Sequence, residues 1–311
     1  MAKIATREAY GKALAALALR NPDVVALDAD LAASTKTNEV KKVAPERHFD
    51  FGIAEANMIG AAAGFACNGK IPFASTFAIF ASGRAYDQVR NSVGYPHLNV
   101  KICATHAGVT VGEDGATHQA LEDLALMRVI PGMTVIQPAD AIETEAVINA
   151  IAEYEGPVYV RLGRAAVEEI NTSPDYKFEI GKGVVIHEGT SPVTMIATGV
   201  MVQEAQKAIE TLNEQGINPN LINIHTIKPI DEELIVRYAE KSDYIVSLEE
   251  HSVIGGLGSA VSEVLARKCP RKQLFIGVQD VFGESGKANQ LMEKYGLAAD
   301  RVVEQVLEFL K

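Results

Sequence analysis

The sequence predicts an α/β protein of two doubly wound domains, each with a mostly parallel sheet. Short β-branched runs alternate with longer segments of helical periodicity along most of the chain, which is the pattern of βαβ units. The alternation weakens between residues 165 and 190, around Pro174, and then resumes. The length of 311 residues also suits two domains of about 150 residues each. We therefore expect a first domain over residues 1–165, a linker over 166–190 and a second domain over 191–311.

The first half is predicted to begin with an amphipathic helix over residues 1–19, which stops at Asn21-Pro22 because the residue before a proline disfavours helix. Charged residues interrupt its apolar run, so it does not have the pattern of a signal peptide. Strands are then expected at 24–28, 71–76, 100–105, 134–137 and 158–162, and helices at 55–67, 77–93, 119–130 and 141–154.

The second half repeats the same alternation of strand and helix. Strands are expected at 193–198, 220–224, 244–248 and 274–278, and helices at 202–215, 231–241, 258–267, 287–295 and 299–310. This order of elements again favours a parallel sheet covered by helices.

The composition favours an enzyme of small molecules over a nucleic-acid binder, because the formal net charge is -11 and no basic stripe offsets it. Three cysteines lie far apart in apolar runs, without the paired spacing of a metal site. That usage fits a reducing compartment. No stretch reaches the length of a membrane span. We therefore expect a soluble protein of the cytoplasm.

Polar residues gather after the predicted strands of the first half. Open parallel sheets bind ligands at the carboxyl ends of their strands, and the residues that follow these strands are Asp30, Ser34, Arg84, the segment from His106 to His118, and Arg164. The sequence therefore predicts a ligand site at this edge of the first sheet.

Two glycine-containing segments do not match phosphate-binding motifs. Gly286-Lys287 is followed by Ala288, where a P-loop requires Ser or Thr. The segment from Gly255 to Ser259 lacks the third glycine of a dinucleotide fingerprint. A tight turn and close helix packing account for its glycines.

Three other patterns each have a structural and a functional interpretation. Glu55 begins an apolar helix, where an acid either complements the helix dipole or serves as a buried functional group. Phe77 and Phe80 can share one helix face, for core packing or for contact with a flat ring. The loop of residues 105–119 carries two histidines and two acids, but their spacing matches no metal motif. For that loop we favour hydrogen bonds to a polyhydroxylated substrate.

Five ordered motifs resemble the pyrimidine-binding and C-terminal domains of transketolase, over nearly the whole chain. They are Phe51-Gly-Ile-Ala-Glu55, Ser75-Thr-Phe77-Ala-Ile-Phe80, Arg84-Ala-Tyr-Asp87-Gln88, Gly112-Glu-Asp-Gly-Ala-Thr-His118 and Leu248-Glu-Glu-His251-Ser-Val-Ile-Gly-Gly-Leu-Gly258. Deoxyxylulose-phosphate synthase and the β chain of 2-oxo acid dehydrogenases are similar in the Ile-Ala-Glu and Gly-Gly-Leu-Gly motifs. The fourth motif favours transketolase over both.

The resemblance implies that thiamine diphosphate is the cofactor. Glu55 would hydrogen-bond the ring nitrogen of its aminopyrimidine, as general acid–base catalysis requires. Phe77 and Phe80 would form the aromatic wall around the ring. Gly83 stands where the family often has a third aromatic residue.

The resemblance also implies a set of sugar-binding residues. Asp114 would bind the donor's hydroxyl next to the carbonyl, and His118 would bind near the reacting end. The sugar phosphate would be held by Arg7, Ser34, His106 and Arg164, and the planar fork of arginine suits that ligand.

A partner chain is a further implication. The family binds the diphosphate through Mg²⁺, on a preceding domain with a Gly-Asp-Gly motif, and this sequence contains no such motif. Met1 also lies only a few residues before Arg7, where the pyrimidine domain should start. We therefore expect no metal ligands here, a separate N-terminal subunit that holds Mg²⁺, and two copies of each chain.

The implied activity is the transfer of a two-carbon ketol unit between sugar phosphates, as in the pentose phosphate pathway. Three alternatives stay open: the β subunit of a 2-oxo acid dehydrogenase first component, a deoxyxylulose-phosphate synthase-like enzyme, and a non-enzymatic interaction subunit. The loop from His106 to His118 and Arg164 argue against the dehydrogenase, and the presence of Glu55 argues against the non-enzymatic subunit.

Overall fold

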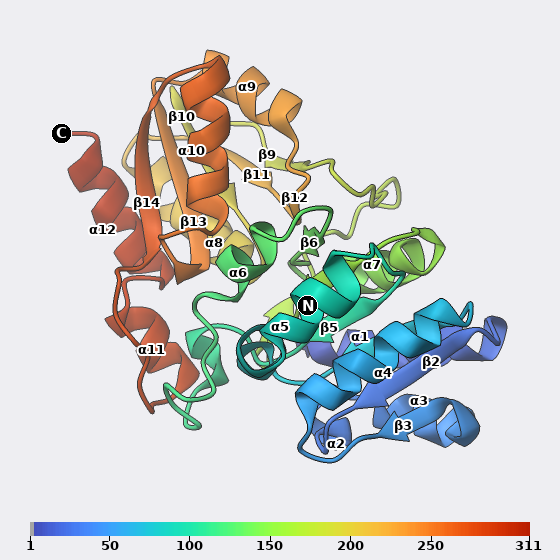
Figure 1. Ribbon diagram of the computed structural model, residues 1–311. Coiled ribbons are helices and arrows are strands. Elements are labelled where there is room, and N and C mark those ends of the chain that lie inside the picture. The colour runs from blue at the N-terminus through green and yellow to red at the C-terminus, as the bar shows by residue number, and fades with distance from the viewer. Residues whose placement is uncertain (1–2) are drawn as a thin grey trace.

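The computed structural model describes residues 3–311, so Met1 and Ala2 of the predicted first helix lie outside the described residues. It has the α/β architecture expected from the sequence, with two mostly parallel sheets covered by helices (Figure 1). The first sheet has seven strands in the order β12-β6-β7-β5-β4-β2-β3. All neighbours in it are parallel except β12 and β6. Its strands are β2 (Val24–Asp28), β3 (His48–Asp50), β4 (Ile71–Ser75), β5 (Lys101–Ala104), β6 (Thr134–Ile136), β7 (Val158–Arg161) and β12 (Thr226–Lys228).

Helices cover both faces of this sheet because side chains of a strand alternate between its faces. Val24 and Ala26 pack in a core cluster with α1 (Thr6–Arg20) and α7 (Ala141–Glu153). Val25 and Leu27 of the same strand belong to the cluster that contains α4 (Glu55–Cys67). The strands are therefore buried on both sides, as the apolar runs in the sequence predict.

The second sheet follows the same rule with five strands in the order β14-β13-β10-β11-β9. Met195 of its central strand packs with the cluster of α8 (Met201–Glu214) and α12 (Ala299–Phe309), whereas Ile196 packs with that of α9 (Glu232–Glu240) and α10 (Leu257–Lys268). Only β9 runs antiparallel to its neighbour. The strands are β9 (Val184–His187), β10 (Val193–Ala197), β11 (Asn220–Asn223), β13 (Tyr244–Ser252) and β14 (Lys272–Val278).

The predicted linker of residues 166–190 contains two short strands. β8 (Ala166–Glu168) pairs antiparallel with β1 (Lys3–Ala5), and β9 forms the edge of the second sheet. In the opposite direction, β12 leaves the second half of the sequence and extends the first sheet. The two halves of the chain are thus joined by strand pairing as well as by the connection.

The predicted helix at 77–93 is wrong in its form. Two π-helical segments, Phe80–Arg84 and Val89–Gly94, flank the single turn α5 (Tyr86–Gln88). Phe77 itself pairs with Thr105, and the amide of Ala78 donates to the Thr105 carbonyl. This pairing delays the start of the helix, and π-helical turns of this kind are frequent at functional sites.

The helix predicted at 119–130 is shorter than expected, because α6 spans Asp123–Arg128. Ala120 instead bridges to Ala107, and its carbonyl accepts a hydrogen bond from the amide of Gly108. The segment expected to begin the helix therefore pairs with the start of the 105–119 loop. We call this pairing of residues 107–108 with residue 120 the neck of the loop. Across residues 3–311, no helix is both long enough and apolar enough to span a membrane.

Candidate active site

Glu55 is a buried acid at the first turn of α4. Its residue is 4% exposed, and its carboxylate accepts a hydrogen bond from Nη1 of Arg84 at 3.0 Å. It follows the carboxyl end of β3, at the edge of the sheet where ligands bind in this architecture. The carboxylate also lies at the helix N-terminus, where negative charge is favoured.

Phe77 and Phe80 form an aromatic surface beside this carboxylate. Their rings stack with an angle of 12° and centroids 5.8 Å apart. The guanidinium of Arg84 lies over the Phe80 ring, with its carbon 4.1 Å from the centroid. One flat cation therefore contacts both the aromatic surface and Glu55.

His106 continues the stack from the next strand. Its ring lies 3.9 Å from that of Phe77, centroid to centroid. Burial lowers the pKa of His106 to about 3, and the charges of Arg7 and Arg164 add to this effect. The imidazole is therefore neutral at physiological pH. Its backbone φ of 57° is uncommon for a residue with a side chain, and such conformations cluster at functional sites.

His118 and Asp114 occupy the far side of the 105–119 loop. The His118 ring meets Phe80 edge-on, with centroids 5.3 Å apart. Asp114 is exposed on the same loop. The structure thus brings His118 to the aromatic surface and leaves the Asp114 carboxylate in solvent.

Arg7 and Arg164 lie near His106, and Ser34 contacts Arg7. Nη1 of Arg7 donates to the carbonyl of Ser34 at 2.8 Å, so the contact uses the backbone of Ser34 and not its hydroxyl. Nη1 of Arg164 donates to the carbonyl of Val111 at 2.7 Å. Burial lowers the pKa of Arg7, and the nearby charge of Arg164 lowers it further, against the opposing effect of Glu8. Partly buried cations of this kind favour an anionic ligand.

Asp28 fixes the segment that carries Ser34. Its carboxylate accepts hydrogen bonds from the amide of Leu31 and from the hydroxyls of Thr35 and Thr37. Burial raises the pKa of Asp28 to about 6, although these hydrogen bonds oppose the shift. The short helix α2 (Ala32–Thr35) is held against the end of β2 in this way.

These residues fit an aminopyrimidine ring. The Arg84 guanidinium stands in for such a ring, because it is a flat group with N–H donors that lies on Phe80 while it donates to Glu55. Its side chain is 54% exposed, so the surrounding protein does not enclose it. Among residues 3–311, no group of three or more His, Cys, Asp or Glu side chains is placed to hold a metal ion.

Two residues near the candidate site, Arg84 and Lys36, have no role that the sequence alone predicts. Arg84 belongs to a recognised motif, but its contact with Glu55 depends on the π-helical turn that carries it. Lys36 adds positive charge near His106, from a left-handed position after α2. No pattern in the sequence predicts the left-handed backbone of Lys36, whose φ is 72°.

The chain matches two domain families. The transketolase pyrimidine-binding domain family matches residues 2–169, and the transketolase C-terminal domain family matches residues 181–302. A protein of Methanocaldococcus jannaschii named as a transketolase C-terminal section is 52% identical over 307 residues, which cover 98% of this chain and 96% of that protein.

Other comparisons give the same family. A solved structure described as the inactive β4 tetramer of a split-gene transketolase is 53% identical, with a TM-score of 0.90, and covers 99% of this chain and 98% of that chain. The 1-deoxy-D-xylulose-5-phosphate synthase of Chlorobium luteolum is 38% identical over 98% of this chain but only 48% of its own length.

These comparisons agree with one another. Transketolase family models match both halves of the chain, and separate C-terminal sections of transketolases are similar to it over nearly its whole length. This chain therefore belongs to the transketolase family, as the C-terminal part of a transketolase-type enzyme, and membership of that family implies dependence on thiamine diphosphate.

Proposed function

We propose that this chain is the C-terminal subunit of a transketolase that transfers a two-carbon ketol unit between sugar phosphates, such as those of the pentose phosphate pathway. One observation carries the proposal: a buried carboxylate, an aromatic surface and a pair of arginines adjoin one another at one sheet edge. Glu55 and Phe77 belong to the cofactor side of this arrangement. Arg7 and Arg164 belong to the substrate side, and His106 lies between them.

Glu55 has the role of general acid and base in this proposal. Thiamine diphosphate, when bound, supplies a nucleophilic carbon and carries the two-carbon unit between donor and acceptor. The carboxyl of Glu55 holds a proton against a pyrimidine nitrogen and sets the tautomer of the ring. Phe77 and Phe80 fix the plane of the ring and keep water from the carboxylate.

The sugar phosphate binds where Arg7 and Arg164 approach His106. Arg7 and Arg164 offer guanidinium N–H groups to the phosphate, and Ser34 offers its hydroxyl. A neutral His106 is able to donate one hydrogen bond and accept another, which suits a sugar hydroxyl. Asp114 and His118 bind the hydroxyl next to the carbonyl and the reacting end of the donor.

The diphosphate and its Mg²⁺ are held by a separate N-terminal subunit, and the active assembly has two copies of each chain in the cytoplasm. Two observations support this part of the proposal. No Gly-Asp-Gly sequence occurs in the chain. The similar split-gene structure, which contains only chains of the β type, is described as inactive.

Reconstitution with the partner subunit tests the function. We expect the mixture, with thiamine diphosphate and Mg²⁺, to transfer a ketol unit from a ketose phosphate to an aldose phosphate. Release of carbon dioxide from pyruvate, with no transfer from ketose phosphates, would contradict the proposal. It would favour a deoxyxylulose-phosphate synthase-like or a 2-oxo acid dehydrogenase activity instead.

A further inference from the structure

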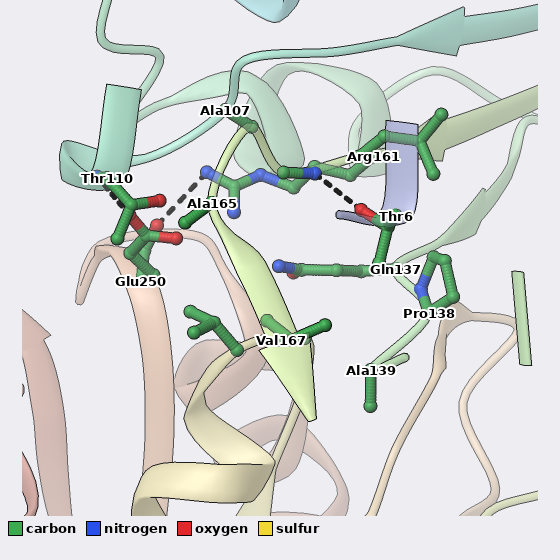
Figure 2. A pocket seen from close by; sticks show the side chains of 14 residues that line it. Thr6, Ala107, Thr110, Gln137, Pro138, Ala139, Arg161, Ala165, Val167 and Glu250 are labelled. Atoms are coloured by element: carbon green, nitrogen blue, oxygen red, sulfur yellow. Dashed lines mark hydrogen bonds between the residues drawn. The ribbon is translucent and has the colours of Figure 1, made fainter. Parts of the chain in front are cut away.

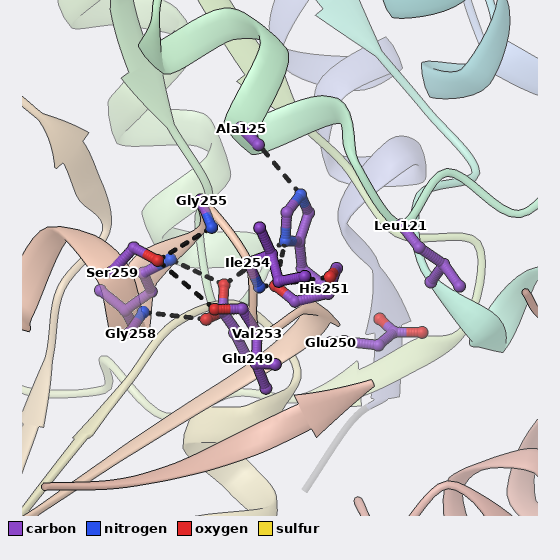
Figure 3. A network of polar contacts seen from close by, with 12 residues as sticks. Leu121, Ala125, Glu249, Glu250, His251, Val253, Ile254, Gly255, Gly258 and Ser259 are labelled. Atoms are coloured by element: carbon purple, nitrogen blue, oxygen red, sulfur yellow. Dashed lines mark hydrogen bonds and ion pairs between the residues drawn. The ribbon is translucent and has the colours of Figure 1, made fainter. Parts of the chain in front are cut away.

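The C-terminal domain reaches the 105–119 loop through the end of β13. This strand pairs in register with β14 up to Leu248, and the register shifts before Ser252. The residues between them leave the ladder and cross to the first domain, where the amide of Ser252 donates to the carbonyl of Leu121 at 2.8 Å. Figure 3 shows Glu249, Glu250 and His251 at this crossing.

Glu250 is the residue of this crossing that enters the loop. Its carboxylate accepts a hydrogen bond from the backbone amide of Thr110 at 2.6 Å, and the residue is 3% exposed. A Cβ on Gly108 would lie only 2.2 Å from the carboxyl carbon of Glu250, so only glycine allows this approach. Glu250 is thus seated directly against the first turn of the loop, as Figure 2 shows from the side of the pocket between the domains.

The turn held by Glu250 also contacts a predicted phosphate-binding residue, Arg164. Thr110 lies in the 3₁₀ turn Val109–Val111, and the carbonyl of Val111 accepts the hydrogen bond from Arg164. A shift of this turn therefore moves the Arg164 guanidinium and the loop residues that follow. His106 lies at the start of the same loop and is subject to the same displacement.

A buried arginine joins Glu250 to the neck of the loop. Nη2 of Arg161 donates to the carbonyls of Glu250 and Ala120, both at 3.0 Å. Nε of the same side chain pairs with the carboxylate of Asp123 at 2.9 Å. The backbone of Glu250 and the neck of the loop are thus anchored to one fully buried cation.

A second C-terminal segment contacts the loop farther along. The side-chain amide of Gln119 donates to the carbonyl of Glu284 at 2.9 Å, and the hydroxyl of Ser285 donates to the carbonyl of Glu113 at 2.6 Å. These contacts are partly or fully exposed. Of these three contacts from the C-terminal domain to the loop, the one with Glu250 is the most deeply buried.

We propose that Glu250 is a positioning residue through which the C-terminal domain sets the geometry of the 105–119 loop and so of sugar-phosphate binding. The structural part concerns the order of the loop and stands by itself. The part on sugar binding rests on the proposed function. Burial raises the pKa of Glu250 to about 7, and the contact persists in either protonation state because a carbonyl oxygen accepts from Thr110 in both.

Glu249 provides a matched control. It is 1% exposed, and burial raises the pKa of its carboxyl to about 7, as for Glu250. Its carboxylate, however, accepts from the amides of Leu257 and Gly258 at the start of α10, inside the C-terminal domain. Replacement of either residue removes a buried carboxylate, but only Glu250→Ala releases the loop.

Hydrogen exchange on the full chain, measured by mass spectrometry, tests the structural part without any assay of activity. In Glu250→Ala we expect peptides of residues 105–119 to exchange about tenfold faster, the size expected for loss of one buried hydrogen bond. In Glu249→Ala the faster exchange should be confined to residues 255–260. Glu250→Gln keeps an acceptor oxygen and should exchange like the wild type in the loop. Unchanged loop exchange in Glu250→Ala, or an equal effect in both alanine variants, overturns the proposal.

Steady-state kinetics of the assembled enzyme test the part on sugar binding. We expect Glu250→Ala to raise KM for a ketose phosphate about tenfold, with little change in the affinity for thiamine diphosphate, and Glu249→Ala to leave KM unchanged. An unchanged KM in Glu250→Ala despite faster loop exchange overturns the link to sugar binding. Absence of any transfer by the wild-type assembly contradicts the proposed function instead, and the exchange result still decides the role of Glu250.

Discussion

Glu55 shows how much of this site depends on single side chains. Position and sequence make it a carboxylate at a helix N-terminus, and the structure buries it against Arg84, whose guanidinium lies over Phe80. A carboxyl group can hold or release a proton at a ring nitrogen, whereas an amide of the same shape cannot. Replacement of Glu55 by Gln therefore tests the proposed proton transfer without a change in the shape of the side chain.

Glu55→Gln should nearly abolish turnover of the assembled enzyme and leave the fold intact. General acid–base assistance is worth about 10²–10⁴-fold in rate, so we expect a loss of at least this order in kcat. Thermal unfolding of the variant checks that the fold is kept. Glu46→Gln, at an exposed acid, is the control and should retain full activity. Wild-type turnover in Glu55→Gln removes this residue from the mechanism.

Arg164→Ala should weaken phosphorylated substrates far more than their unphosphorylated analogues. A charge-assisted hydrogen bond contributes about 1.5–3 kcal/mol, which corresponds to a rise in KM of about 10- to 100-fold. Steady-state kinetics with a sugar phosphate and the free sugar measure the difference, and Arg90→Ala on an exposed turn is the control. Equal losses on both substrates mean that Arg164 acts only by holding Val111.

The sequence selects these residues through motifs, but it does not predict the protonation states and contacts that the structure gives them. Glu55, Phe77 and His118 all stand in motifs that the sequence shows. In the structure Glu55 begins α4, and the rings of Phe77 and His118 both contact that of Phe80. The neutral state of His106 arises from burial and from arginines that are distant in the sequence. Likewise, the Glu55–Arg84 pair joins residues 29 positions apart. No local pattern encodes such contacts.

At the scale of elements, most regular helices and strands agree with those expected from the sequence. The segments 77–93 and 119–130, at the candidate site, differ from the helices expected there. The predicted range 55–67 agrees with α4, and 24–28 agrees with β2. The segment 77–93 has helical periodicity but forms π-helical turns, because Phe77 and Ala78 are tied to Thr105. Tertiary contacts override the local preference where the site is built.

The start of α7 is an element that joins the domains. Glu143 is fully buried and accepts from the amide of Ala139, the hydroxyl of Tyr176 and the side-chain amide of Asn223. These partners come from the first domain, the linker and β11. Asp140 caps the same helix through the amide of Glu143. A buried ionisable side chain therefore lies in the contact between the two domains.

Glu143 predicts a pH dependence of stability. Burial raises its folded-state pKa to about 7, above the ordinary value of 4.5. The folded chain therefore keeps this proton while the unfolded chain loses it, and the free energy of unfolding falls as pH rises from about 4.5 to 7. Denaturant unfolding should show that the free energy of unfolding of the wild type falls between pH 5 and pH 8 relative to that of Glu143→Gln, whose side chain does not titrate. The exposed Glu145→Gln on the same helix should show no such difference.

At the scale of the whole molecule, the two domains share more than a connection. β12 from the second half completes the first sheet, and Glu250 reaches into the 105–119 loop. The sequence predicts the class of fold, but it does not predict the pairing of β12 or of β8. Such short edge strands lack the periodicity that identifies longer ones.

The central claim is that this chain holds one half of the cofactor site. Isothermal titration calorimetry of thiamine diphosphate with Mg²⁺ tests it most directly, first with the chain alone and then after addition of the N-terminal subunit. We predict no tight binding by the chain alone, because Mg²⁺ requires oxygen ligands, which in the proposed function come from the partner. Once the partner is present, we predict Mg²⁺-dependent binding. Tight, Mg²⁺-dependent binding of thiamine diphosphate by the chain alone would contradict the account.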